Sequence, residues 1–89
     1  MKWLMAVYGT AAIQFEQVRY LVSFDAEAHD GRGDALFTLY KERATRFDSF
    51  KEVMELWGTI SKVRPLREDG KPNRPLTTFT ISPEKVDEP

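Results

Sequence analysis

Three ionisable side chains alternate after residue 24 and could act as one site. Asp25, Glu27 and His29 are two residues apart, so an extended backbone would place them on one side of a strand. Carboxylates beside an imidazole can hold a divalent cation or act as a general base. The chain has no second histidine, however, and two glycines follow. We therefore interpret residues 26–34 as a solvated hairpin loop that collects charges, and we expect no metal ion and no cofactor.

Nucleophilic catalysis would need a hydroxyl or thiol within reach of a base. None of the serines, at positions 23, 49, 61 and 82, has the sequence context of a nucleophile elbow. The chain has no cysteine, which excludes disulfides and thiolate metal sites and fits a cytoplasmic location. These features predict a protein that is not an enzyme and has no catalytic residues.

Positive charges gather in two stretches, one at residues 41–46 and the other at residues 62–74. If both stretches lay on one side of the domain, they could contact phosphates, with Tyr40 as a stacking group. Acidic residues are interleaved with them, so a solvated surface of mixed sign is the alternative interpretation. The candidate partner-binding residues are Tyr40, Arg43, Arg46, Arg64 and Arg67.

The overall charge and hydropathy limit the kinds of partner. The formal net charge is −1, which argues against a general nucleic-acid coat or a membrane-surface peptide. No apolar run approaches the length needed to cross a bilayer, so we expect no membrane partner.

One amphipathic helix is expected at residues 49–57, and it must position whatever surface the domain presents. Ser49 and Glu52 have the spacing of a capping box, in which the carboxylate reaches back to the Ser49 amide. Apolar residues then recur at i, i+3, i+4 and i+7, which predicts a buried stripe of Phe50, Val53, Met54 and Trp57. Gly58 is expected to end the helix in the left-handed conformation.

Strands are expected on both sides of this helix. Residues 15–25 alternate and predict a strand whose Val18, Tyr20 and Val22 face the helix. Further strands are predicted at residues 35–45, 59–64 and 76–82. Residues 1–8 are apolar on both faces, as in a strand covered on two sides, and a buried helical turn is the competing interpretation.

These elements predict a small α+β domain, an antiparallel sheet of four to five strands with one amphipathic helix on one face. The chain length suits a single domain, which we place at residues 1–83, followed by a flexible charged tail at residues 84–89.

The order of elements around the helix resembles that of small phage-encoded inhibitor proteins. The similar stretch is RFDSFKEVMELWG at residues 46–58 followed by ISKVRP at residues 60–65, about a fifth of the chain. It is similar to strand-strand-helix-strand inhibitors of bacterial RNA polymerase and to small anti-CRISPR proteins. The resemblance implies a non-enzymatic protein that occludes a surface on a larger bacterial complex, and it assigns no individual residues.

The leading hypothesis is therefore a small non-enzymatic protein-binding module, encoded by a phage or plasmid, that inhibits or adapts a larger bacterial protein complex. The alternative is a nucleic-acid-binding domain that uses the basic residues of the second predicted strand and of the segment after the helix. A third hypothesis is a homodimer that buries the sheet face opposite the helix.

Overall fold

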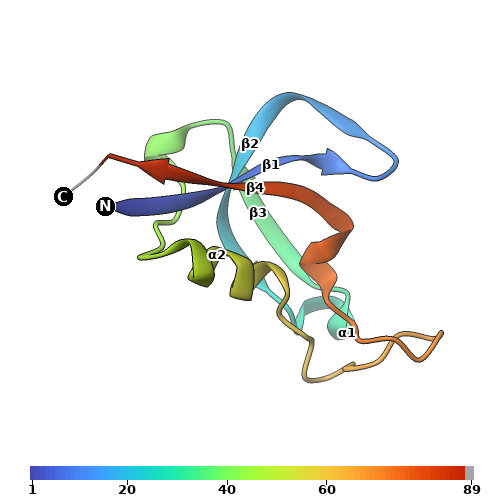
Figure 1. Cartoon of the computed structure of the whole chain (residues 1–89). Helices are drawn as coiled ribbons and strands as arrows, with labels where there is room; N and C mark the ends of the chain where they lie inside the picture. Colours follow the sequence, from blue (N-terminus) through green and yellow to red (C-terminus); the bar gives the residue numbers. More distant parts are fainter. Residues whose placement is uncertain (88–89) are drawn as a thin grey trace.

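The computed structural model describes residues 1–87, and it forms one antiparallel sheet with a helix on one face (Figure 1). The strands have the spatial order β3-β2-β1-β4. Their bounds are β1 Lys2–Thr10, β2 Gln14–Asp25, β3 Asp34–Thr38 and β4 Phe79–Val86. The main helix is α2 Phe50–Trp57, and the short turns are α1 Ala28–Gly31, η1 Lys41–Arg43 and η2 Pro75–Thr78. The predicted α+β class is confirmed.

The central strand β1 is buried on both faces. Met5 and Val7 belong to the apolar cluster that α2 covers, while Leu4 and Ala6 belong to a second cluster on the opposite face. All four of these side chains are fully buried. The first segment of the chain is therefore a strand covered on two sides, as its apolar residues on both faces predict.

The predicted facing of β2 is wrong. Tyr20 pairs with Ala6 and lies with Leu4 on the face away from α2, whereas Leu21 is fully buried on the helix side. An irregularity at Val22 then shifts the register between β2 and β3. Because both faces of this sheet bury apolar residues, alternation shows that β2 is a strand but does not show which face meets the helix.

The strand predicted at residues 35–45 is too long, because β3 ends at Thr38. The hydroxyl of Thr38 accepts a hydrogen bond from the amide of Tyr40 at 3.1 Å and turns the chain. The following connection covers the second face, where Ala44 packs with Leu4, Ala6 and Tyr20. That face is therefore partly covered by the chain itself.

The chain then passes from one face of the sheet to the other through an opening between β1 and β2. The amide of Thr45 donates to the carbonyl of Leu21 at 3.0 Å. Two residues on, Phe47 exchanges two backbone hydrogen bonds with Trp3, each 2.8 Å long. The short extended piece at residues 45–47 thus takes the place beside β1 that β2 leaves when it diverges.

Helix α2 begins at a cap but ends differently from the prediction. The hydroxyl of Ser49 accepts from the amide of Glu52 at 3.2 Å, while the Glu52 carboxylate accepts from the amide of Asp48 at 2.7 Å, not from that of Ser49. Gly58 has a φ of −89°, so it is not left-handed. A left-handed residue is not required, because the hydroxyl of Thr59 donates to the free carbonyl of Glu55 at 3.0 Å.

The predicted apolar stripe of α2 faces the sheet in part: Val53 and Trp57 pack in the core cluster, whereas Phe50 and Met54 belong to neither apolar cluster. Val53 is fully buried, and the indole N–H of Trp57 donates to the carbonyl of Phe79 at 3.1 Å. Phe50 lies at the margin, half exposed and edge-on to Trp3 with ring centroids 5.7 Å apart. Leu56 also packs against this cluster, although the predicted stripe omits it.

The C-terminal part of the chain differs most from the prediction. Residues 59–64 are not a strand, and the last strand runs from Phe79 to Val86, with η2 in place of its predicted start. Residues 84–86, expected in the tail, pair with Leu4, Trp3 and Lys2 of β1. Glu88 and Pro89 lie outside the described residues.

Candidate functional site

Residues 59–75 form a loop, here called the finger, that projects from the sheet at the lower right of Figure 1. The loop folds back on itself through backbone hydrogen bonds from Asn73 to Pro65 at 2.9 Å and from Arg67 to Lys71 at 2.8 Å. Its tip turns at Gly70, whose φ of +83° suits a residue without a side chain. Loops of this length without regular secondary structure are usually functional sites or disordered segments.

The first fastening of the finger is a carboxylate. Glu27 accepts hydrogen bonds from the hydroxyl of Ser61 at 2.8 Å and from the amides of Lys62 at 2.7 Å and Val63 at 3.1 Å. The amide of Lys62, followed by that of Val63 and the Ser61 hydroxyl, lowers the pKa of Glu27 below its ordinary value of 4.5. Ser61 is fully buried at this junction. Glu27 therefore holds the finger in place in its ionised form.

Glu27 therefore does not form a site with Asp25 and His29, the two residues with which it alternates in the sequence. Asp25 accepts a hydrogen bond from the amide of Glu27 at 2.9 Å, and His29 is exposed. Within residues 1–87, no three histidine or acidic side chains gather into a group that could hold a metal ion.

The second fastening is the amide side chain of Asn73. Its nitrogen donates to the carbonyl of Gly31 at 2.7 Å and to that of Arg64 at 2.9 Å. Gly31 is buried here with a φ of +88°, and a β-carbon on it would lie 2.5 Å from that of Arg64. The close approach of two backbones at Gly31 and the bridge from Asn73 fix the finger against α1.

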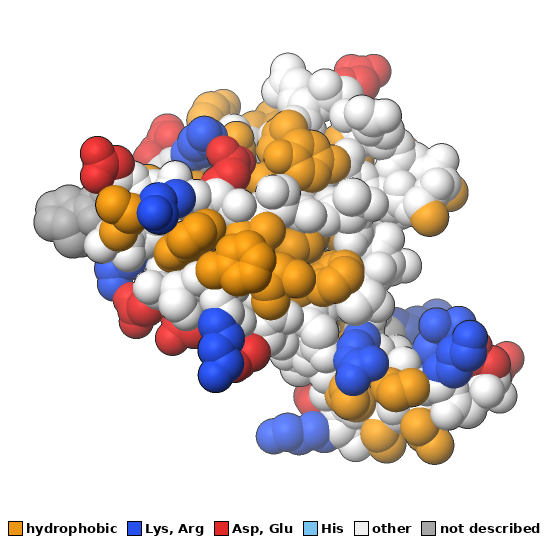
Figure 2. Space-filling model, in the orientation of Figure 1, with side chains coloured by type: hydrophobic (Ala, Val, Ile, Leu, Met, Phe, Trp, Pro, Cys, Tyr) orange, Lys and Arg blue, Asp and Glu red, His pale blue; other side chains and the backbone are white. Residues whose placement is uncertain are grey.

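The surface of the finger combines exposed apolar side chains with positive charge. Val63 and Leu66 are 59% and 58% exposed, and Ile60 is 39% exposed. The finger carries five basic and two acidic residues, a net +3, so the remainder of the chain carries −4. In Figure 2 the lobe at the lower right shows this mixture of hydrophobic and basic side chains.

The structure divides the predicted partner-binding residues into two separate groups. Arg64 and Arg67 lie on the finger, where Arg64 pairs with Asp30 at 3.4 Å and Arg67 with Asp69 at 3.0 Å. The other three lie on or beside η1, at the far end of the sheet from the finger in Figure 1. A single surface containing all five does not exist.

The group beside η1 makes mostly local contacts. Tyr40 is 55% exposed, and the guanidinium of Arg43 lies 5.2 Å from the centre of its ring. Arg46 donates through Nη1 to the carbonyls of Lys41 at 2.8 Å and Ala44 at 3.1 Å. These bonds give Arg46 a structural role in holding the connection that covers the second face.

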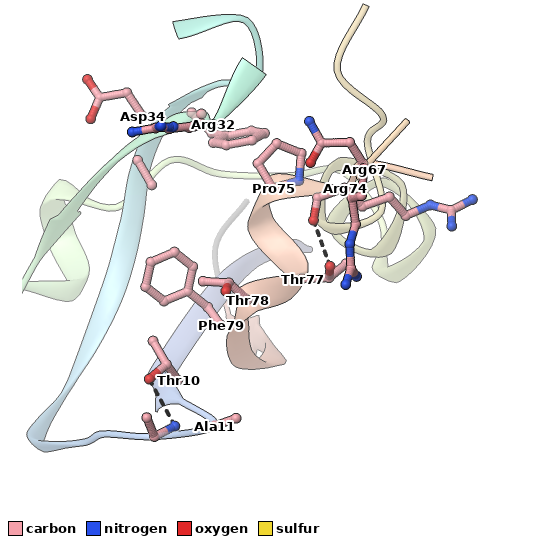
Figure 3. Close-up of a pocket in the computed structure, with 15 residues that line it drawn as sticks. Thr10, Ala11, Arg32, Asp34, Arg67, Arg74, Pro75, Thr77, Thr78 and Phe79 are labelled. Carbon is pink, nitrogen blue, oxygen red and sulfur yellow. Dashed lines mark hydrogen bonds between the residues drawn. The ribbon is translucent and has the colours of Figure 1, made fainter. Parts of the chain in front are cut away.

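A notch of about 890 Å³ separates the finger from the turn between β1 and β2 (Figure 3). Three of its lining residues are arginines, at positions 32, 67 and 74. The other lining side chains are mainly threonines and apolar residues: Thr10, Ala11, Ala12, Phe24, Ala35, Pro75, Thr77, Thr78 and Phe79. The candidate residues named from the sequence did not include Val63, Leu66 or Arg32. For Val63 and Leu66, the one feature of the sequence that could have indicated a role is their position among basic residues.

No family model matches the chain, and no match was found among curated proteins or solved structures. In the part of the chain that the structure describes, no helix combines the length and the apolar character that spanning a membrane requires.

Proposed function

We propose that the protein is a non-enzymatic protein-binding module, an adaptor or inhibitor, whose finger docks on a larger protein. The observation that supports this proposal is the pair of apolar side chains, Val63 and Leu66, each more than half exposed on a loop with a fastened base. Single exposed apolar residues are ordinary, but these two and Ile60 belong to the same loop.

The fastened base favours binding energetically. Burying a valine or leucine side chain in a partner contributes about 1.5 to 3 kcal/mol to the binding free energy. Ordering a mobile loop on binding costs conformational entropy, which is subtracted from this contribution. Here Glu27, Asn73 and the backbone bonds of the finger already hold the loop in one conformation. Docking therefore costs less entropy than it would for a mobile loop.

The charge distribution indicates the chemistry of the partner surface. Lys62, Arg64 and Arg67 flank the exposed apolar side chains, so a complementary surface has an apolar pocket with an acidic rim. The finger carries +3 and the rest of the chain −4, so an acidic partner is attracted to the finger and repelled elsewhere. This asymmetry orients the encounter as well as accelerating it.

Two leucines of equal exposure allow a matched test. Leu66 on the finger and Leu36 on β3 are each 58% exposed. Wild type, Leu66→Ala and Leu36→Ala should be used as baits in extracts of the organism that encodes the chain. The captured protein should then be purified and titrated against each variant.

We expect Leu66→Ala to weaken the purified complex about tenfold or more and Leu36→Ala to leave it unchanged. Equal affinities for the two variants, or no complex with wild type, would refute docking through the finger. Capture that depends on Tyr40 and Arg43 instead would move the docking surface to the far end of the sheet. Capture of nucleic acid alone would favour a nucleic-acid-binding role.

A further inference from the structure

We propose that the notch between the finger and the β1–β2 turn binds a short stretch of single-stranded nucleic acid. This site is distinct from the apolar part of the docking surface, because neither Val63 nor Leu66 lines the notch, although Arg67 belongs to both. The guanidinium groups of Arg32 and Arg74 provide hydrogen-bond donors in the notch, and apolar side chains complete its lining.

Two arginines stand on opposite walls of the notch. In Figure 3, Arg32 lies with Asp34 on one side and Arg74 beside Pro75 and Thr77 on the other. Within residues 1–87, the side chain of Arg32 has no hydrogen bond or ion pair. Among the described residues, the Arg74 side chain donates only through Nε, to the carbonyl of Gly58 at 3.0 Å, which orients the guanidinium and leaves both terminal nitrogens to donate.

The remaining polar groups of the notch also favour an acceptor-rich ligand. Thr10 Oγ1 already accepts from the amides of Ala12 at 3.2 Å and Ile13 at 3.0 Å, so its own hydrogen is left to donate. Thr78, the last residue of η2, is exposed, whereas the hydroxyl of Thr77 already donates to the carbonyl of Arg74 at 2.6 Å. Asp34 is the one acid among the lining residues that the structure describes.

Between the arginines the notch is lined by apolar side chains. Phe24, Pro75 and Phe79 line the notch, and Figure 3 shows Pro75 between the two arginines and Phe79 below them, beside Thr10. The ring of Phe79 is part-buried and packs edge-on with that of Phe37, with ring centroids 5.0 Å apart. A flat ring can pack on such a surface without a specific hydrogen bond. The notch therefore offers positive charge on two sides and an apolar surface in the middle.

This arrangement distinguishes among phosphate-bearing ligands. A free mononucleotide has its phosphate at one end, so it can satisfy one wall. A nucleotide inside a strand has a phosphate on each side of its base, so it can place one phosphate on each wall. A duplex keeps its bases stacked inside and cannot place one on Phe79. An unpaired strand is the ligand that uses the whole notch.

The positive charge is local to the notch. Arg67 points away from the notch in Figure 3, and the adjoining cavity of about 530 Å³ that it lines with Arg32 and Arg64 is also lined by Glu68 and Asp69. Because the whole chain has a net charge of −1, attraction of a phosphate backbone depends on Arg32 and Arg74 and not on overall charge.

Fluorescence anisotropy with a labelled oligothymidylate at low salt tests the proposal. We expect Arg32→Ala and Arg74→Lys each to weaken binding about tenfold, because each removes a bidentate phosphate contact. Arg32→Ala should also reduce the slope of log K against log salt by about 0.7, the value for one lost single-strand phosphate contact. Arg43→Ala, which removes the same charge at the far end of the sheet, should change little.

Two ligand controls need no substitution. A strand with abasic positions keeps its phosphates and should bind more weakly, and thymidine monophosphate should compete poorly. The proposal is refuted if wild type does not bind the strand, if a duplex binds as tightly, or if Arg43→Ala weakens binding as much as Arg32→Ala. Since Leu66→Ala should leave strand binding unchanged, failure here is distinguishable from failure of protein docking.

Discussion

Replacing Asn73 with alanine should loosen the finger without unfolding the sheet. The substitution removes the two hydrogen bonds of its side-chain nitrogen, at 2.7 Å and 2.9 Å, and leaves the carbonyls of Gly31 and Arg64 without that donor. Each neutral hydrogen bond contributes about 0.5 to 1.5 kcal/mol, so local opening should become easier by about 1 to 3 kcal/mol. That change corresponds to about 5- to 150-fold faster opening-limited exchange.

Native-state hydrogen exchange measures this opening directly. The amide of Ser61 donates to the carbonyl of Asn73 at 3.0 Å, and the amides of Lys62 and Val63 donate to Glu27. Exchange of these three amides should accelerate in Asn73→Ala. Amides of β1 should accelerate less, because β1 lies in both apolar clusters and the finger is not part of either, so we expect β1 to exchange through global unfolding.

Asn73→Asp is the decisive control, because it preserves the size of the side chain and reverses its hydrogen bonding. A carboxylate in that position would face the carbonyls of Gly31 and Arg64, acceptor against acceptor. We therefore expect faster exchange in the aspartate variant than in the alanine variant. Unchanged exchange at Ser61 in Asn73→Ala, or an aspartate variant that resembles wild type, would refute the assigned role of Asn73.

Three further predictions concern the same fastening and the core. The finger lowers the pKa of Glu27 below 4.5, so the ionised carboxylate stabilises the fold fully above pH 4.5, and this contribution is lost as the pH falls through the lowered folded-state pKa. In thermal melts across an acid pH series, the melting temperature of Glu27→Gln should therefore depend less on pH than that of wild type. Gly31→Ala should reduce stability, measured by urea unfolding, more than Gly70→Ala, because both have positive φ but only Gly31 has a close neighbour for the added carbon; equal losses would contradict the packing argument. Trp57→Ala should cost about 3 kcal/mol of unfolding free energy and Trp57→Phe about 1 kcal/mol, the latter mainly from the bond to Phe79; a wild-type midpoint for Trp57→Ala would mean that the indole does not stabilise the core.

The sequence was most informative where a pattern is local. Ser49 and Glu52 mark the start of α2, and the spacing of Val53 and Trp57 identifies its buried side, because both signals depend on neighbouring residues alone. The facing of β2 was not predictable from alternation, since Tyr20 and Leu21 are both buried, on opposite faces.

The fastening of the finger depends on partners far apart in the chain. Residues 59–64 alternate like a strand, but their amides bond to Glu27 and not to a neighbouring strand. Nothing within the segment reveals this, because the bonds join residues more than thirty positions apart. Likewise, the candidate arginines could be named from their charge, but their division into two distant groups follows only from the fold.

The passage of residues 45–47 between β1 and β2 has a consequence for cooperativity. Two consecutive segments of the chain cover the two faces of β1: the connection that contains Ala44 covers one face, and α2 covers the other. Between them, Phe47 is hydrogen-bonded to Trp3 of β1. Displacing either cover pulls on this junction and so strains the opposite layer. The two apolar layers should therefore melt in a single transition, although the sheet separates them.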